Sequence, residues 1–195
     1  MTTSRIDTWI KVGYKILATE GVEGIKIERL ARALKLNKSG FYYYFGTLKA
    51  YSNRLLEYHV DMARAISEEV KHCGNIDPDL LLLVVRRREF FLVESQLHLR
   101  GKPAFFDGDI DEAGELVNKA IVPLWKKSSG LQLQSSVALA YLNIIRHFFY
   151  ARIYPANINY EFLHKLTAET KGVLNDVVAA RVVSPQGKQK SAQFG

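Results

Sequence analysis

The sequence has little of what stabilises secreted and membrane proteins. Its single cysteine, Cys73, cannot form an internal disulfide. No segment approaches the roughly 18 uncharged apolar residues that a membrane span needs, and the first residues lack the apolar stretch of a signal peptide. We therefore expect a cytoplasmic protein that has no membrane partner.

Motifs for catalysis and metal binding are also missing. The histidines show no metal-ligand spacing, and we find no phosphate-binding glycine loop and no nucleophile motif. The segment "DGDID" (107–111) resembles the start of a calcium-binding loop. However, Glu112 stands where an EF-hand requires glycine, and Asn118 stands where it requires glutamate. We expect no catalytic residue, no metal site and no cofactor, and hence no enzyme.

Positive charge is concentrated near the N-terminus. The net charge is +7, and residues 1–60 hold ten Lys and Arg against five Asp and Glu. Residues 61–183 hold fifteen of each. This distribution indicates either a head that binds a polyanion, on a neutral body, or simply a solvated basic face.

Apolar residues recur at helical spacing along most of the chain, and no strand pattern appears. We predict an all-α protein in which three short helices precede longer ones. Helices are expected at residues 6–20, 27–34, 38–44, 48–72, 77–99, 109–127, 131–154 and 159–182. Pro123 is expected to kink or end the helix that contains it. The predicted division is a head of three short helices at 1–50, a larger helical domain at 51–183 and a flexible basic tail at 184–195.

The segment "NKSGFYYYF" (37–45) places three tyrosines between two phenylalanines. Phe41 and Phe45 are four residues apart, so on a helix they share a face and can anchor it to the preceding helices. Tyr42, Tyr43 and Tyr44 point in directions about 100° apart, and at least one must face water or a partner. A phenol hydroxyl can bond a phosphate oxygen while its ring packs on protein or sugar.

Residues 5–56 resemble the helix-turn-helix of the TetR family of transcriptional regulators. The match includes Gly21, which closes the first helix, Leu30-Ala31 in the second, and Phe41-Tyr42 and Tyr44-Phe45 in the recognition helix. The resemblance implies that residues 1–50 are a three-helix DNA-binding domain and that residues 51–183 are a larger helical domain for ligand binding and dimerisation.

Three positions depart from the family pattern. Lys26 replaces the Ser or Thr that caps the second helix, so we expect weaker capping. Lys35 replaces the turn glycine and would be strained in a left-handed conformation, so we expect the turn to differ slightly. Leu48 replaces a lysine at the start of the fourth helix, where the neighbouring Lys49 can substitute.

The resemblance also implies which residues contact double-stranded DNA. Base-edge candidates are Lys38, Ser39, Gly40 and Tyr43, and Lys38 could bond either guanine or phosphate. Tyr42 and Tyr44 are candidates for phosphate contacts or for packing. The full set of predicted DNA-binding residues is Lys26, Asn37, Lys38, Ser39, Gly40, Tyr42, Tyr43, Tyr44 and Lys49.

The helix at 131–154 is apolar nearly all round, and the last helix has a broad apolar stripe. Together with the resemblance, this predicts a homodimer through the last two helices. The resemblance further implies a pocket for an unidentified small-molecule effector. Its candidate residues, which could equally be ordinary core, are Met62, Phe90, Phe91, Phe105, Trp125, Tyr141, Ile145 and Phe148. Asn143, Arg146 and Tyr150 form a polar stripe that fits a ligand's polar end or a dimer contact.

We therefore predict a TetR-like regulator, a repressor released from its operator by a small apolar or aromatic ligand. The alternative is an all-α ligand-binding module or enzyme without a DNA-binding role. Residues 26–49 carry six Lys and Arg against one acid, Glu28, which favours the regulator.

Overall fold

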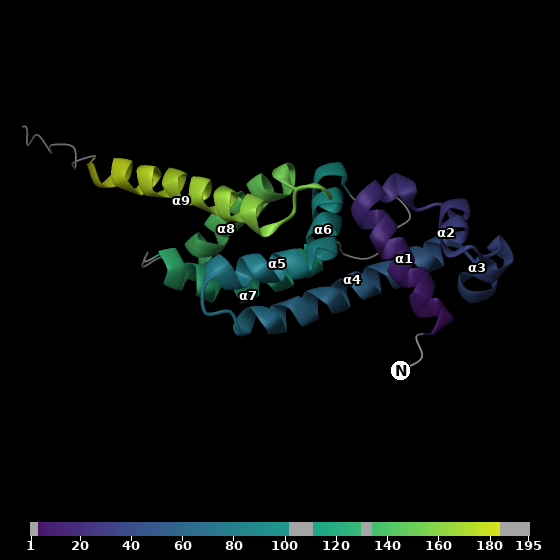
Figure 1. Cartoon of the computed structure of the whole chain (residues 1–195). Helices are drawn as coiled ribbons and strands as arrows, with labels where there is room; N and C mark the ends of the chain where they lie inside the picture. The colour runs from purple at the N-terminus through teal and green to yellow at the C-terminus, as the bar shows by residue number, and fades with distance from the viewer. Residues whose placement is uncertain (1–3, 102–110, 130–133, 184–195) are drawn as a thin grey trace, which may run out of the picture.

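The structure, a computed structural model, describes residues 4–101, 111–129 and 134–183. These ranges form α-helices and short helical turns without any β-strand, as predicted (Figure 1). The elements follow in the order α1 (Arg5–Glu20), η1 (Val22–Gly24), α2 (Ile27–Leu34), α3 (Lys38–Phe45), α4 (Leu48–Lys71), η2 (Ile76–Leu80), α5 (Leu81–Arg86), α6 (Arg88–Arg100), α7 (Asp111–Ser129), α8 (Ser135–Arg152) and α9 (Tyr160–Val183).

The first three helices form the head of the molecule. A capping box starts α1: the Ser4 hydroxyl accepts from the Asp7 amide, and the Asp7 carboxylate accepts from the Ser4 amide. Lys26 stands at the N-cap of α2 without a side-chain capping bond, as expected. The expected change in the turn is wrong. Lys35 occupies the left-handed conformation itself, with φ 56° and ψ 39°.

A long α4 leads from the head into the body (Figure 1). Thr47 caps it by accepting a hydrogen bond from the Ala50 amide at 3.1 Å. Within the body α4 packs along α7, while α8 packs on both α6 and α7. The head is joined to the body directly as well, because α1 packs against α6. One continuous cluster of buried apolar side chains therefore runs from the head into the body.

Two body segments differ from the sequence-based expectation. The helix predicted at 77–99 is divided into η2, α5 and α6, with a break at Arg87. This break turns the Arg87 guanidinium towards α4, where its Nε donates to Glu69 at 2.9 Å. The helix α7 does not end at Pro123 but continues to Ser129.

Candidate nucleic-acid interface and effector cavity

Helix α3 is fixed to the head by its two phenylalanines. Phe41 is fully buried and Phe45 nearly so. Both rings meet the indole of Trp9 edge-on, at centroid distances of 5.7 and 6.4 Å. Contacts of this kind hold aromatic rings in defined orientations. The 41/45 spacing predicted this anchor, and it determines which face of α3 points outward.

The outward face of α3 presents tyrosine rings to solvent. Tyr42 is 53% exposed and Tyr43 is 82% exposed. Tyr44 is half-buried and packs edge-on against Tyr43, with ring centroids 5.0 Å apart. The exposure of two large aromatic side chains on a short, firmly anchored helix indicates a surface that meets a partner.

The remaining predicted DNA-binding residues lie around the same helix. Asn37 takes the N-cap position of α3, although its side chain makes no capping bond. Ser39 is exposed, and a side chain added at Gly40 would come no closer than 3.9 Å to Trp9. Lys26 and Lys49, at the starts of α2 and α4, are exposed too. All nine predicted residues therefore lie in α3 or at the starts of α2, α3 and α4.

Lys38 has an internal partner in this surface. Its ammonium donates to Glu28 Oε1 at 3.0 Å, across the two helices of the helix-turn-helix. The pKa of Glu28 is lowered by a backbone hydrogen bond and by Lys38. A DNA phosphate or guanine would therefore compete with Glu28 for the Lys38 ammonium.

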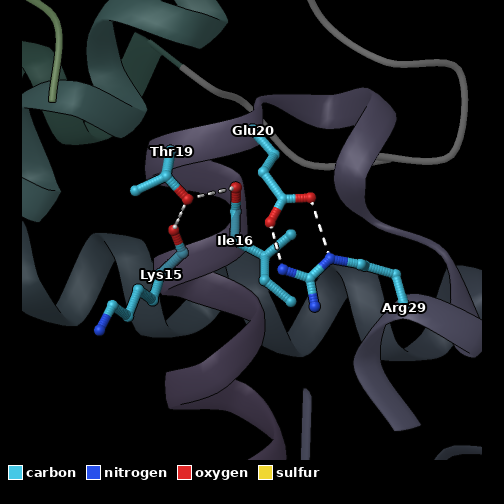
Figure 2. A network of polar contacts seen from close by, with 5 residues as sticks. All are labelled: Lys15, Ile16, Thr19, Glu20 and Arg29. Atoms are coloured by element: carbon cyan, nitrogen blue, oxygen red, sulfur yellow. Dashed lines mark hydrogen bonds and ion pairs between the residues drawn. The ribbon is translucent and has the colours of Figure 1, made fainter. Parts of the chain in front are cut away.

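A second ion pair connects α1 and α2. In Figure 2 the Arg29 guanidinium of α2 reaches both carboxylate oxygens of Glu20 at the end of α1, with Nε 3.1 Å from Oε2. Beside it, the Thr19 hydroxyl donates to the Lys15 carbonyl at 2.8 Å. The Arg29–Glu20 pair is bidentate, which adds directionality to an exposed ion pair that otherwise contributes little stability.

The junction between the head and α4 depends on a glycine. Tyr51 of α4 is fully buried and donates from its hydroxyl to the Trp9 carbonyl of α1 at 3.0 Å. A Cβ on Gly13 would lie only 1.6 Å from that hydroxyl oxygen. The phenol can reach the α1 backbone only because residue 13 has no side chain. The sequence predicted neither the hydrogen bond of Tyr51 to α1 nor the need for glycine at position 13.

A chain of buried hydrogen bonds crosses four helices. Tyr14 of α1 lies 2.7 Å from His59 Nδ1 of α4, and His59 Nε2 lies 2.8 Å from Glu94 Oε1 of α6. Tyr150 of α8 donates to Glu94 Oε2 at 3.2 Å. We call Tyr14, His59, Glu94 and Tyr150 the polar chain. It joins α1 of the head to α8 of the body.

Burial keeps the two phenols of the polar chain protonated. It is the largest cause of the raised pKa of both Tyr14 and Tyr150, and the Glu94 charge adds to it. The protonated phenols can therefore act as donors, Tyr14 to His59 and Tyr150 to Glu94. The only sequence signal for this network was a glutamate inside the apolar run "FFLVESQL". Tyr150 was predicted only as a member of the polar stripe, and no sequence signal pointed to its bond with Glu94 or to the roles of Tyr14 and His59.

The body contains a cavity of about 170 Å³ next to the polar chain. Of the predicted ligand residues, Phe91, Trp125, Ile145 and Phe148 line this cavity. Tyr141 instead stacks on Trp125, with centroids 6.3 Å apart, and Met62 and Phe90 pack in the main core. Phe105 lies outside the described residues. The further lining residues are Ile76, Leu80, Leu81, Val84, Val117, Asn118, Ile121, Leu142, Arg146, Phe149, Tyr150, Leu163, Leu166, Thr167 and Thr170.

The polar stripe predicted on α8 has two members in the cavity wall. Arg146 and Tyr150 both line it, and the Arg146 Nε atom is buried without a hydrogen-bond partner. Asn143 accepts from the amide of Asn118, a lining residue of α7, at 3.1 Å. Two apolar side chains of α8 are exposed: Ile144 is 66% exposed, and Phe148, which also lines the cavity, is 45% exposed.

Two other kinds of site do not occur in the described ranges. No three His, Cys, Asp or Glu side chains of these residues gather into a possible metal site. Nor is any helix in the same part of the chain both long and apolar enough to cross a bilayer.

The chain is similar to two solved structures. PfmR, a TetR-family transcriptional regulator from Thermus thermophilus, matches with a TM-score of 0.56 over 87% of this chain and 95% of that chain, at 15% identity. A proposed TetR-family transcriptional regulator from Rhodococcus sp. matches with a TM-score of 0.50, over 89% of this chain and 97% of that chain, at 16% identity. No protein-family model and no curated protein sequence matches the chain. The likeness confirms the predicted TetR-like fold, with an N-terminal helix-turn-helix and a larger helical C-terminal part.

Proposed function

We propose that the chain is a DNA-binding transcriptional regulator of the TetR type. The observation that supports this most is the outward face of α3, where Tyr42 and Tyr43 stand exposed on a helix locked by Phe41 and Phe45. Helix α3 is the second helix of the helix-turn-helix formed by α2 and α3. In such a unit the second helix enters the major groove. Phenol hydroxyls and nearby lysines then bond phosphates, and Lys38 reaches base edges or phosphate.

The active form is a homodimer that pairs α8 and α9. Ile144 and Phe148 leave an apolar face of α8 open, and a second copy would cover it. Two recognition helices about 34–36 Å apart then fit successive major grooves of a pseudo-palindromic operator. The basic charge concentrated in the head agrees with this orientation.

The cavity receives a small effector, and the protein is a repressor that the effector releases. Binding shifts the population of dimers towards a separation of the heads that no longer fits the operator. The polar chain supplies a route for this coupling. It connects Tyr150 in the cavity wall, through Glu94 and His59, to Tyr14 in the head.

Fluorescence anisotropy tests the DNA-binding proposal. The purified protein is titrated on duplexes selected from a random pool and on the DNA upstream of its own gene, with a scrambled duplex as control. Tyr42→Ala should weaken binding. Tyr154→Ala should not, because Tyr154 is an equally exposed tyrosine (57%) just after the end of α8.

Salt dependence gives a second readout. If the dimer neutralises roughly eight phosphates, log affinity should fall with log salt with a slope of about −7. Tight, sequence-selective and salt-steep binding that is lost in Tyr42→Ala supports the regulator. If no duplex is selected, the DNA-binding proposal fails. The cavity would then favour the alternative, an all-α ligand-binding module.

A further inference from the structure

The chemistry of the cavity wall points to a particular class of effector. Most lining residues are apolar or aromatic, and Arg146 is the one charged residue among the described residues that line the cavity. A single fixed positive charge in an apolar wall is costly to bury unless an opposite charge meets it.

Arg146 lacks such a partner within the described chain. Its Nε is buried and unbonded, and no salt bridge to it occurs in the described ranges. Its Nη1 lies over Gly114 of α7, where an added Cβ would be only 2.8 Å away. Buried donors of folded proteins almost always have an acceptor, so this atom calls for one.

Glu94 does not fill this role. Its Oε2 also approaches Gly114, at 2.5 Å from the same Cβ position, but the carboxylate already accepts from His59 and Tyr150. It does not bond the Arg146 Nε, which stays unpartnered. Arg146 is itself a lining residue, so a ligand in the cavity lies against its side chain.

We propose that the cavity binds a small apolar monocarboxylate whose carboxylate pairs with Arg146. This inference rests on the effector cavity proposed above. A guanidinium presents paired N–H donors that match a carboxylate. The single guanidinium matches one carboxylate, whereas a dianion such as a phosphate ester would bring a second negative charge next to Glu94. The volume of about 170 Å³ is close to that of engineered cavities that hold a benzene ring.

The position of the ligand carboxylate would also explain how ligand binding changes the DNA-binding head. A negative charge at Arg146 lies next to Glu94, the central member of the polar chain. Like charges in a buried site repel strongly. The Glu94 carboxylate would then be displaced, which alters its bond to His59 and, through His59, the contact with Tyr14 in the head.

Isothermal titration calorimetry without DNA tests the proposal with matched probes. The probes are hexanoate and benzoate, their neutral amides hexanamide and benzamide, and their cationic counterparts hexylamine and benzylamine. In each set the pentyl or phenyl group is constant, and the carboxylate is replaced by a carboxamide or by an aminomethyl group. The variants are Arg146→Gln, which removes the charge, Arg146→Lys, which keeps it, and Arg88→Gln, an exposed arginine of α6 as control.

At least one acid should bind tenfold or more tightly than its amide and its amine. Arg146→Gln should abolish this preference and leave amide affinity within about threefold. Arg146→Lys should retain part of it, and Arg88→Gln all of it. The proposal is overturned if neither acid binds, if amides match acids, or if the preference survives Arg146→Gln. If Arg146→Gln does not fold, the binding of acids, amides and amines to the wild-type protein and to Arg146→Lys still tests the proposal. Because no DNA is present, a negative result leaves the DNA-binding proposal standing, and the anisotropy assay decides that separately.

Discussion

Gly13→Ala is the substitution for which the structure gives the sharpest expectation. In an open helix, alanine in place of glycine raises the free energy of unfolding by about 1 kcal/mol. Here the added methyl would lie 1.6 Å from the Tyr51 hydroxyl oxygen and 2.8 Å from its Cζ. The ring cannot withdraw easily, since it is fully buried with the Phe41 and Phe45 rings at 5.2 and 5.0 Å.

Two penalties oppose the gain in helix propensity. Overpacking a close-packed core costs about 1–3 kcal/mol, and sometimes more. Pushing the phenol away from the Trp9 carbonyl also loses a buried hydrogen bond, about 1 kcal/mol. We expect Gly13→Ala to lower the free energy of unfolding by about 1–3 kcal/mol in total.

Urea unfolding followed by circular dichroism measures the change. Gly172→Ala is the matched control, because a Cβ there meets nothing within 4 Å and should not destabilise. In a Tyr51→Phe background the hydroxyl is gone, so Gly13→Ala should become at least about 1 kcal/mol less damaging. If Gly13→Ala were as stable as the wild type, or if the two changes were simply additive, the described contact between α4 and α1 would be wrong.

Three further changes test other parts of the head. Lys35→Gly should raise the free energy of unfolding by about 0.5–1 kcal/mol in urea, because Lys35 has a φ of 56° and glycine relieves that strain at some entropic cost; a loss of stability would contradict the left-handed turn. Glu28→Gln should release the Lys38 ammonium for contact with DNA. DNA affinity should then rise at low salt, and the slope of log affinity against log salt should steepen by about one ion per protomer. Weaker binding would show instead that the Glu28–Lys38 pair orients Lys38 for its contact with DNA. Burial raises the pKa of Tyr14 and Tyr51, so the folded chain keeps protons that the unfolded chain loses above about pH 10. Stability should therefore be lost as pH rises from about 10 towards the folded pKa values. In thermal melts, Tyr51→Phe should reduce the pH dependence of stability in this range by up to one proton. An unchanged pH dependence would refute the assignment of this loss to Tyr51.

The sequence predicted what depends on local spacing. Helical periodicity located the elements of the head, and the 41/45 spacing identified the buried face of α3. The Thr47 cap was predictable because a cap and its helix are adjacent in the chain. The break at Arg87 was not, since the Glu69 carboxylate that holds its guanidinium belongs to α4, 18 residues earlier.

The cavity shows a different limit of sequence patterns. Periodicity separates buried faces from exposed ones, but it does not tell whether a buried side chain meets another side chain or open space. Phe91 and Phe90 are neighbours and both buried, yet Phe91 lines the cavity while Phe90 stacks on His59 at 4.7 Å. Similarly, the bonded members of the polar chain are separated by 35 to 56 residues in sequence, so only the folded chain brings them together.

The polar chain also constrains how such a sequence can diverge. Each of its side chains supplies the hydrogen-bond partner of the next, so exchanging Glu94 alone would leave His59 and Tyr150 with unmet donors in the core. Substitutions at these positions should therefore be tolerated in combination rather than singly. In a library randomised at Tyr14, His59, Glu94 and Tyr150, the surviving sequences should be either complete polar sets or wholly apolar ones, and mixed sets should be rare.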